Sequence, residues 1–413
     1  MNQQLYVLPR VSPCPKPQRS IFRPLPAALV LGLSLALTAC GGGSSDQGSN
    51  PPAATISRAE LGEKIFNDIS LSASGQQACA SCHATATGHA GPNDLPTQLG
   101  GPSLDQQGGR NSPGIRYLAS NTPFHFDAEG KAAGGFFWDG RATSLQDQAG
   151  KPFFNPKEMA NESVEALIAK LARASYAAEF AAMFGADIFS RPQDALNRMT
   201  LVLQAYEQSP EFQPFDSKYD EFLRGKLALN PQELRGLALF NAKDKGNCAA
   251  CHPSAKGADG SHPLFTDFSY DNLGVPRNAK LSQNADPAFF DLGLCAREGG
   301  DLTARQELCG AFKVPSLRNV TQRLSYFHNG RFTSLREVLQ FYVQRDTDPQ
   351  KWYSLTADGR VNKFDDLPAE LHKNVNTSEG PYNRKPGEAP ALSEQEIDDV
   401  LAFLATLSDG FKK

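Results

Sequence analysis

Methionine is nearly absent from this sequence. There are four methionines in 413 residues, and none follows Met199, so the second half of the chain offers no thioether side chain to a metal. A strong net charge is absent as well, because 41 basic and 45 acidic residues leave −4 at pH 7. No basic surface therefore points to nucleic acid. The composition, 40% hydrophobic and 21% charged, is that of a globular protein, and the length suits two domains.

No apolar run is long enough to span a bilayer, and the most apolar one lies near the N-terminus. Residues 27–36 follow several basic residues, which is the order of an export signal. The run leads to Leu37-Thr-Ala-Cys40, which resembles a bacterial lipoprotein signal with Cys40 as the acylated first residue. We expect residues 1–40 to be this signal, residues 41–57 to be a flexible linker, and the protein to lie in the periplasm, with its lipid as its one membrane contact. An ordinary cleaved signal is the alternative.

The eight cysteines fall into three groups. Cys14 and Cys40 lie in the signal region, and four others stand in two C-x-x-C-H motifs. Cys295 and Cys309 remain. In an exported protein this even remainder predicts a disulfide that closes a short loop, with two free thiols as the alternative.

An internal repeat divides the chain into two halves. Residues 62–67 read G-E-K-I-F-N and precede the first C-x-x-C-H motif, and residues 236–241 read G-L-A-L-F-N and precede the second. Two copies indicate two similar units. We expect one domain over residues 58–212 and another over 213–413, with the boundary between Ser209 and Pro214.

Helical patterns dominate what can be read of local structure. Ser57 and Glu60 have the spacing of a capping box at the start of the folded part. Apolar periodicity predicts four further helical stretches. These are residues 163–184, 193–208, 334–343 and 393–407. Strand alternation is scarce, and 29 prolines with 35 glycines imply long loops, so the fold class is mainly α.

The two C-x-x-C-H motifs predict covalently bound haem c. Two thiols at this spacing can add to the two vinyl groups of haem, and the adjacent histidine then reaches the iron. The expected residues are Cys79, Cys82 and His83 for the first haem, and Cys248, Cys251 and His252 for the second. A redox disulfide or a zinc site is the alternative, but neither needs this motif twice, each time after a matching helix.

The ligand on the other side of each iron decides between electron transfer and catalysis. A methionine from the second half cannot serve the second haem, because none exists there. The remaining candidates are His262, His328, His372, a tyrosine or water.

Several longer strings resemble the bacterial di-haem cytochrome c peroxidase and MauG superfamily. They are F-W-D-G-R at 137–141, N-P-K-E-M at 155–159, F-K-V-P-S-L-R-N at 312–319 and Y-F-H-N-G at 326–330. The resemblance covers the chain from about residue 58 to its end. It implies two cytochrome c-like domains, each with one covalently bound haem.

The resemblance also implies a sixth ligand for the second haem. In the family this ligand follows the histidine of the last string by fourteen residues, which leads from His328 to Tyr342. A tyrosine there is typical of the MauG-like branch and agrees with the missing methionine. The phenolate oxygen would give this haem a low potential and let it share oxidising equivalents with the first. A tyrosine packed in the core is the alternative.

For the first haem the resemblance implies an open iron. Typical peroxidases carry a distal histidine where this chain has Leu99, and His89 nearby is expected to be a surface or loop residue. Glu158 matches the acid that moves protons during cleavage of the peroxide O–O bond, although a surface glutamate at a helix start is the alternative. Gln148 and Pro152 match other residues of the distal pocket.

Three further roles come from the resemblance. Trp138 matches a tryptophan that lies between the haems, and the alternative is a core aromatic. His328 is expected to support the second haem through its propionates or nearby waters. Asn111 matches an asparagine that helps to bind calcium between the domains, with backbone carbonyls near Arg323 and Ser325 as its partners.

Three functions remain open on the sequence. The first is a peroxidase that reduces hydrogen peroxide with electrons from a small cytochrome c or cupredoxin. The second is a MauG-like enzyme that oxidises Trp or Tyr residues of a partner protein. The third is a non-enzymatic di-haem electron carrier. A homodimer is expected because dimers are common among similar peroxidases.

Overall fold

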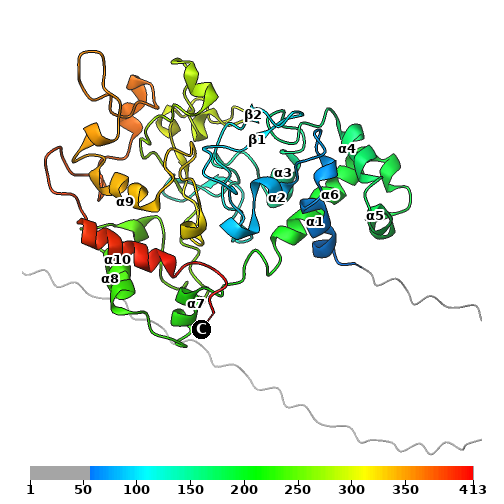
Figure 1. Ribbon diagram of the computed structural model, residues 1–413, viewed down its shortest axis with the longest axis horizontal. Coiled ribbons are helices and arrows are strands. Elements are labelled where there is room, and N and C mark those ends of the chain that lie inside the picture. The colour runs from blue at the N-terminus through cyan, green and yellow to red at the C-terminus, as the bar shows by residue number, and fades with distance from the viewer. Residues whose placement is uncertain (1–55, 413) are drawn as a thin grey trace, which may run out of the picture. The chain divides into compact units, whose positions relative to one another are not determined.

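The computed structural model describes residues 56–412 (Figure 1). The predicted signal, the lipidation site Cys40, Cys14 and all of the predicted linker except residues 56 and 57 lie outside the described residues. Among the helices that are described, none is both long enough and apolar enough to cross a membrane.

Helices and loops make up most of the described chain, as the sequence predicts. The α-helices are α1 (Arg58–Phe66), α2 (Cys79–Cys82), α3 (Leu145–Gly150), α4 (Val164–Leu171), α5 (Ala177–Phe184), α6 (Pro192–Glu207), α7 (Lys218–Leu223), α8 (Pro231–Asn241), α9 (Leu335–Gln344) and α10 (Glu394–Ala405). The strands form three antiparallel pairs: β1 (Leu99–Gly100) with β2 (Gln106–Gln107), β3 (His125–Phe126) with β4 (Ala132–Ala133), and β5 (Tyr270–Asp271) with β6 (Phe312–Lys313).

The capping box expected at the start of the folded part is present. The Glu60 N–H donates to the Ser57 side chain at 3.2 Å, and the Ser57 N–H donates to the Glu60 carboxylate at 2.8 Å. The long helix expected over 163–184 is interrupted, because α4 ends at Leu171 and α5 begins at Ala177. The intervening Tyr176 is buried and donates its hydroxyl to Asp68 at 2.6 Å, so a tertiary contact overrides the local pattern.

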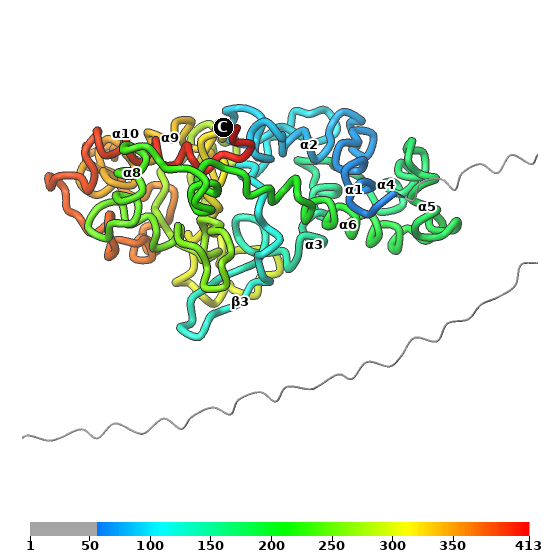
Figure 2. The backbone as a smooth tube through the Cα atoms, turned by 90° about the horizontal axis from the view of Figure 1, so that it is seen from below, coloured from blue at the N-terminus to red at the C-terminus, as the bar shows by residue number. Residues whose placement is uncertain are grey.

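Each half of the chain has a pair of helices that cross closely. α1 packs on α6, and α8 packs on α10 (Figures 1 and 2). A methyl group added at Gly62 would lie 2.0 Å from the carbonyl oxygen of Val202, and one added at Gly236 would lie 2.0 Å from that of Asp399. The first residue of each repeated string is therefore a glycine because no side chain fits at the crossing.

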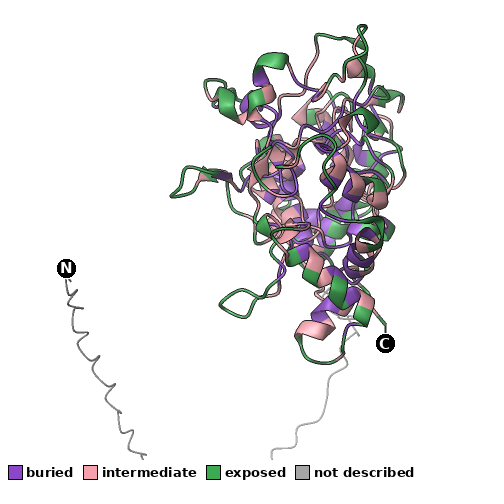
Figure 3. Cartoon of the chain, turned by 90° about the vertical axis from the view of Figure 1, so that its left-hand side faces the viewer, coloured by how far each residue is buried: buried purple, intermediate pink, exposed green. Residues whose placement is uncertain are grey.

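Two large hydrophobic clusters form the core. One draws its buried residues from positions 61–212 and contains α1 and α6, and the other draws them from 219–407 and contains α8 and α10. Figure 3 shows buried positions gathered on the inward sides of the helices. We retain the division into two domains near Ser209 to Pro214 as a proposal.

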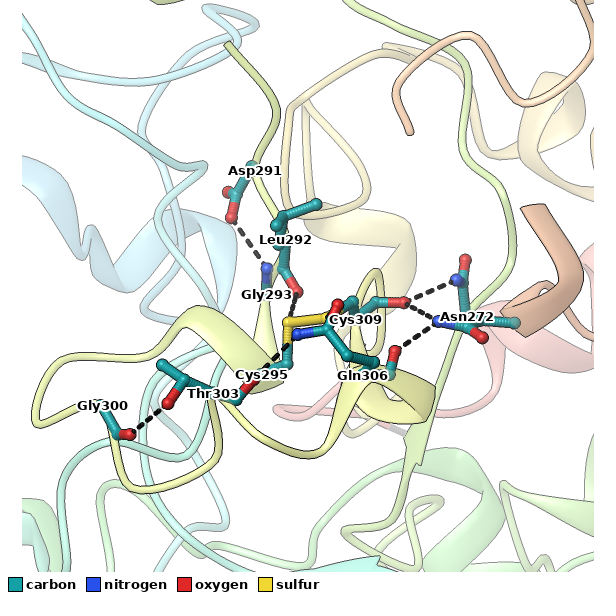
Figure 4. The surroundings of a disulfide bond; sticks show 10 residues. Asn272, Asp291, Leu292, Gly293, Cys295, Gly300, Thr303, Gln306 and Cys309 are labelled. Carbon is teal, nitrogen blue, oxygen red and sulfur yellow. Dashed lines mark hydrogen bonds between the residues drawn. A yellow bond between two sulfur atoms is a disulfide. The ribbon is translucent and has the colours of Figure 1, made fainter. Parts of the chain in front are cut away.

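Cys295 and Cys309 are both buried and joined by a disulfide with an S–S distance of 2.08 Å (Figure 4). Asn272 donates its amide to the Cys309 carbonyl at 3.2 Å, which ties the closed loop to the strand region around β5. The other four described cysteines are free thiols, each in a C-x-x-C-H motif.

Changing Gly236 to Ala should destabilise the protein. The added methyl group would push α8 away from α10, and overpacking of this kind costs about 1–3 kcal/mol. An ordinary Gly→Ala change in a helix is instead stabilising by about 0.5–1 kcal/mol. Gly150→Ala is the matched control, because a methyl group there meets its nearest atom at 3.4 Å. Denaturant unfolding measures both, and equal stability of the two variants would contradict the crossing argument.

Candidate functional site

The predicted haem residues line two large cavities. Cys79, Cys82 and His83 line one of them, called the first cavity, with an empty volume of about 1500 Å³. The second cavity, of about 1490 Å³, is lined by Cys248, Cys251 and His252. Both are partly open to solvent. Both volumes include space that is open to solvent. Each cavity combines two thiols and an imidazole in its lining, which are the groups that attach haem c.

Both histidines are held with one ring nitrogen turned to the cavity. Nδ1 of His83 bonds to the carbonyl oxygen of His89 at 3.2 Å, and Nδ1 of His252 bonds to that of Phe265 at 2.8 Å. Burial lowers the pKa of His83 to about 4 and also lowers that of His252. Each imidazole thus favours the neutral form with its proton on Nδ1, which is the form that binds a metal through Nε2.

Trp138 forms a wall common to the two cavities. Its indole N–H donates to the carbonyl oxygen of Asn111 at 2.8 Å. The N–H of Asn111 in turn donates to the carbonyl oxygen of His328 at 2.8 Å. The aromatic ring between the cavities is therefore fixed by backbone bonds from both halves of the chain.

The surroundings of Trp138 and His328 repeat each other. Residues 136–147 read F-F-W-D-G-R-A-T-S-L-Q-D, and residues 326–337 read Y-F-H-N-G-R-F-T-S-L-R-E. The preceding phenylalanines share a left-handed backbone, with φ of 64° at Phe137 and 65° at Phe327. Each segment leads into a helix, α3 or α9, capped by its serine. A comparison of the sequence with itself would have found this second repeat, which the analysis of the cysteine motifs missed.

This repeat pairs Pro152 with Tyr342, because each stands seven residues after the first residue of its helix. Tyr342 lies on α9 and lines the second cavity, whereas Pro152 follows the end of α3 and lines the first. Proline has no side-chain atom that could bind a metal. The predicted ligand position is thus occupied by a tyrosine in one cavity and by a proline in the other.

The other candidates for the sixth ligand are held elsewhere. Nδ1 of His262 bonds to Asp220 at 2.6 Å, and Nε2 of His372 bonds to the Leu367 carbonyl at 3.1 Å. Of the three candidate histidines, His328 lines the second cavity, and so do the tyrosines Tyr326 and Tyr342. His328 lies flat against Phe312, with 3.5 Å between ring centroids. Tyr382 also lines this cavity, and the sequence analysis did not single it out.

Glu158, Gln148 and Leu99 come together in the first cavity, as expected. Burial raises the pKa of Glu158, although Arg141 and Asn155 oppose the shift. The Gly101 N–H donates to the Glu158 carbonyl at 2.7 Å. The Gln77 amide donates to the Leu99 carbonyl at 3.0 Å. These two hydrogen bonds join β1 and the residue after it to Gln77 on one side and to Glu158 on the other.

His89 lies in a loop, as one half of the expectation had it, but it does not lie at the surface. The residue is fully buried, and burial lowers its pKa to about 3. Its ring packs against Phe212 at 4.2 Å between centroids and accepts a hydrogen bond from Arg116 at 2.9 Å. Its carbonyl is the acceptor that orients His83, so the residue positions the first metal ligand.

The surroundings of Asn111 do not fit the calcium expected there. The amide oxygen of Asn111 faces the guanidinium of Arg323, with Nη2 at 3.4 Å. Its amide nitrogen donates to Ser325 Oγ at 2.6 Å, and the Arg323 carbonyl accepts from the Tyr326 hydroxyl at 2.8 Å. A cation therefore already faces the side-chain oxygen that calcium would need.

Comparison with known proteins agrees with this geometry. Residues 57–228 match the family described as di-haem cytochrome c peroxidase. The chain is 36% identical to the methylamine utilization protein MauG of Paracoccus denitrificans over 85% of this chain and 88% of that protein. It is 32% identical to the cytochrome c551 peroxidase of Nitrosomonas europaea over 68% of this chain and 71% of that protein. The crystal structure of the dihaem peroxidase BthA from Burkholderia thailandensis aligns with a TM-score of 0.78 and 39% identity, covering 86% of each chain.

The mainly α fold and the paired cavities thus define a di-haem oxidoreductase. The chain belongs to the di-haem cytochrome c peroxidase family, in which both MauG proteins and cytochrome c peroxidases are found. Haem c is the cofactor that this family implies.

Glu207 is a buried acid that the sequence analysis missed. It ends α6 and lines the first cavity beside Cys79, and its Oε2 has no hydrogen-bond partner. Burial alone raises its pKa to about 8. At pH 7 the carboxyl group is therefore mainly protonated and adds no full negative charge beside Cys79.

Glu207 should make stability depend on pH. The unfolded carboxyl has a pKa of about 4.5, so between about pH 4.5 and 8 the folded state holds a proton that the unfolded state releases. Stability from this group is therefore complete below pH 4.5 and falls as pH rises, by at most about 1.4 kcal/mol per pH unit. Glu207→Gln should lose this slope and become the more stable protein at pH 8. Denaturant unfolding at several pH values measures it, with exposed Glu129→Gln as the control. Parallel pH curves for Glu207→Gln and the unmodified protein would refute the assignment.

Proposed function

We propose that the protein is a peroxidase that reduces hydrogen peroxide in the first cavity with electrons from a small donor protein, a cytochrome c or a cupredoxin. One peroxide, two protons and two electrons give two waters, and the O–O bond is broken. The observation that carries the proposal is the pairing of Pro152 with Tyr342. It leaves room for peroxide at one centre and provides a ligand at the other.

The chain's residues fit a haem c in each cavity. Cys79 and Cys82 would bind the first haem and His83 its iron, while Cys248, Cys251 and His252 would do the same for the second. Tyr342 lines the same cavity and would be a further ligand of the second iron. Bound haem supplies redox-active iron, which neither cavity has from side chains alone.

Proton movement falls to Glu158 in this proposal. Its carboxylate would take the proton from the peroxide oxygen nearer the iron and deliver it to the leaving oxygen, which then departs as water. A pKa raised by burial suits a group that must both accept and donate a proton near neutral pH. Gln148 lines the same cavity and would orient the peroxide through its amide.

Electrons would reach the first cavity through Trp138. Its ring borders both cavities and is held by the Asn111 carbonyl, so it provides a fixed aromatic path between them. The donor protein would therefore deliver electrons to the second centre.

Oxidation of Trp or Tyr residues in a partner protein is the second candidate. Tyr342 favours it, because an anionic oxygen ligand stabilises oxidised iron. Similarity to MauG of Paracoccus denitrificans favours it too. A non-enzymatic carrier is less compatible with Pro152, since it needs ligands on both sides of both irons.

The proposed location rests on the sequence. We propose that the protein is exported to the periplasm, anchored by a lipid on Cys40, and forms a homodimer. A mass spectrum of the mature N-terminus that lacks the lipid would disprove the anchor.

Glu158→Gln should slow the reaction of the oxidised protein with peroxide by about 10²-fold or more, because the amide cannot carry the proton. Stopped-flow spectroscopy measures the rate. Glu162→Gln is the matched control, since Glu162 is an exposed acid four residues away. An unchanged rate would exclude Glu158 from proton transfer, and a lack of any spectral change with the unmodified protein would refute the peroxidase itself.

Tyr342→Met should raise the reduction potential of the second haem and change its absorption spectrum, because a neutral thioether replaces an anionic oxygen. A tyrosine-to-methionine variant of the similar peroxidase BthA has been crystallised, with a TM-score of 0.77 to this chain. Spectroelectrochemistry measures the potential. Tyr353→Phe is the control, because Tyr353 is buried and donates its hydroxyl to the Gly274 carbonyl. A spectrum that Tyr342→Met leaves unaltered would show that Tyr342 is no ligand.

A further inference from the structure

Arg323 is half-buried, and its contacts differ from those of the buried Arg318 and Arg345. Arg318 pairs with Asp220 at 2.9 Å, and Arg345 pairs with Asp346 at 2.7 Å. The guanidinium of Arg323 instead contacts two neutral oxygens, Oδ1 of Asn111 and the carbonyl of Ser112, both at 3.4 Å. Its buried Nε has no partner. A charged group placed in this way has unused capacity to bind an anion.

The position of this guanidinium connects it to both cavities. Arg323 lines the second cavity, and Asn111 lines the first. Asn111 is also the residue whose carbonyl holds the Trp138 indole. The positive charge of Arg323 therefore contacts Asn111, the residue that holds Trp138 between the two cavities.

We infer that the Arg323 guanidinium takes the place of a bound divalent cation between the two cavities. It holds the Asn111 side chain from one side. On the other side its free Nε binds a propionate carboxylate of the haem in the second cavity. The inference rests on the proposed occupancy of that cavity by haem.

Two physical arguments support an arginine, and not a metal ion, at this position. Burial lowers the pKa of Arg323 to about 10, so the group stays charged at neutral pH. A calcium ion on Asn111 Oδ1 would then lie next to a fixed positive charge, and like charges at such distances repel. Calcium also favours carboxylate oxygens, and among residues 56–412 no group of three or more acidic, His or Cys residues is arranged to hold a metal ion.

The first test needs no variant. The purified holoprotein is exchanged into buffer with either calcium or a calcium chelator, and metal content, haem spectrum and thermal unfolding are measured. We expect no retained calcium and identical spectra and unfolding midpoints. One calcium per chain, or a chelator effect on the spectrum, would overturn the inference. The haem count of the same sample tests the proposed function separately, because two haems without calcium satisfy both.

The second test removes the cation. Arg323→Ala should lower the reduction potential of the second haem, because loss of a nearby positive charge favours the oxidised iron. Arg331→Ala is the matched control, since Arg331 is exposed and stands eight residues further along. Spectroelectrochemistry that finds the same potential in both variants would overturn the inference. If Arg323→Ala does not fold, Arg323→Gln keeps most of the volume without the charge and is measured in the same way.

Discussion

The hydrogen bond from the Trp138 indole to the Asn111 carbonyl is the contact on which the arrangement of the two centres depends. Asn111 also donates its own N–H to the His328 carbonyl, at 2.8 Å, so residues from both halves of the chain meet at this point. Because the indole borders both cavities, a shift of its ring would alter both at once. Rigid placement here lets two cofactor sites work as one unit.

Similarity between the halves makes their differences informative. Both halves have a glycine at a helix crossing, a C-x-x-C-H motif and an aromatic turn with a left-handed phenylalanine. At two equivalent positions the halves differ. The first half has Trp138 and Pro152 where the second half has His328 and Tyr342. In the proposed function, these two differences at repeated positions distinguish an open haem site from one with a further protein ligand.

Most of the correct predictions came from the spacing of motifs along the sequence. The cysteine motifs located both cavities, and the missing methionines narrowed the candidates for the sixth ligand to a set that includes Tyr342. Burial was harder to predict, because no local pattern shows that the loop residue His89 is covered by Phe212 and Arg116. The residues that contact the Asn111 side chain, Ser325 and Arg323, lie more than two hundred residues away, so the guanidinium on its amide oxygen could not be deduced from local pattern.

Buried charge is distributed differently in the two cavities. In the first, burial raises the pKa of both Glu158 and Glu207, so acids there retain protons more readily than in water. In the second, Arg323 contributes a positive charge that no carboxylate of the described chain neutralises. In the proposed function, acids that retain protons suit the centre at which peroxide oxygen leaves as water, and an unpaired cation suits the centre that binds the anionic haem propionates. The buried charges therefore distinguish the first cavity from the second, as the difference between Pro152 and Tyr342 also does.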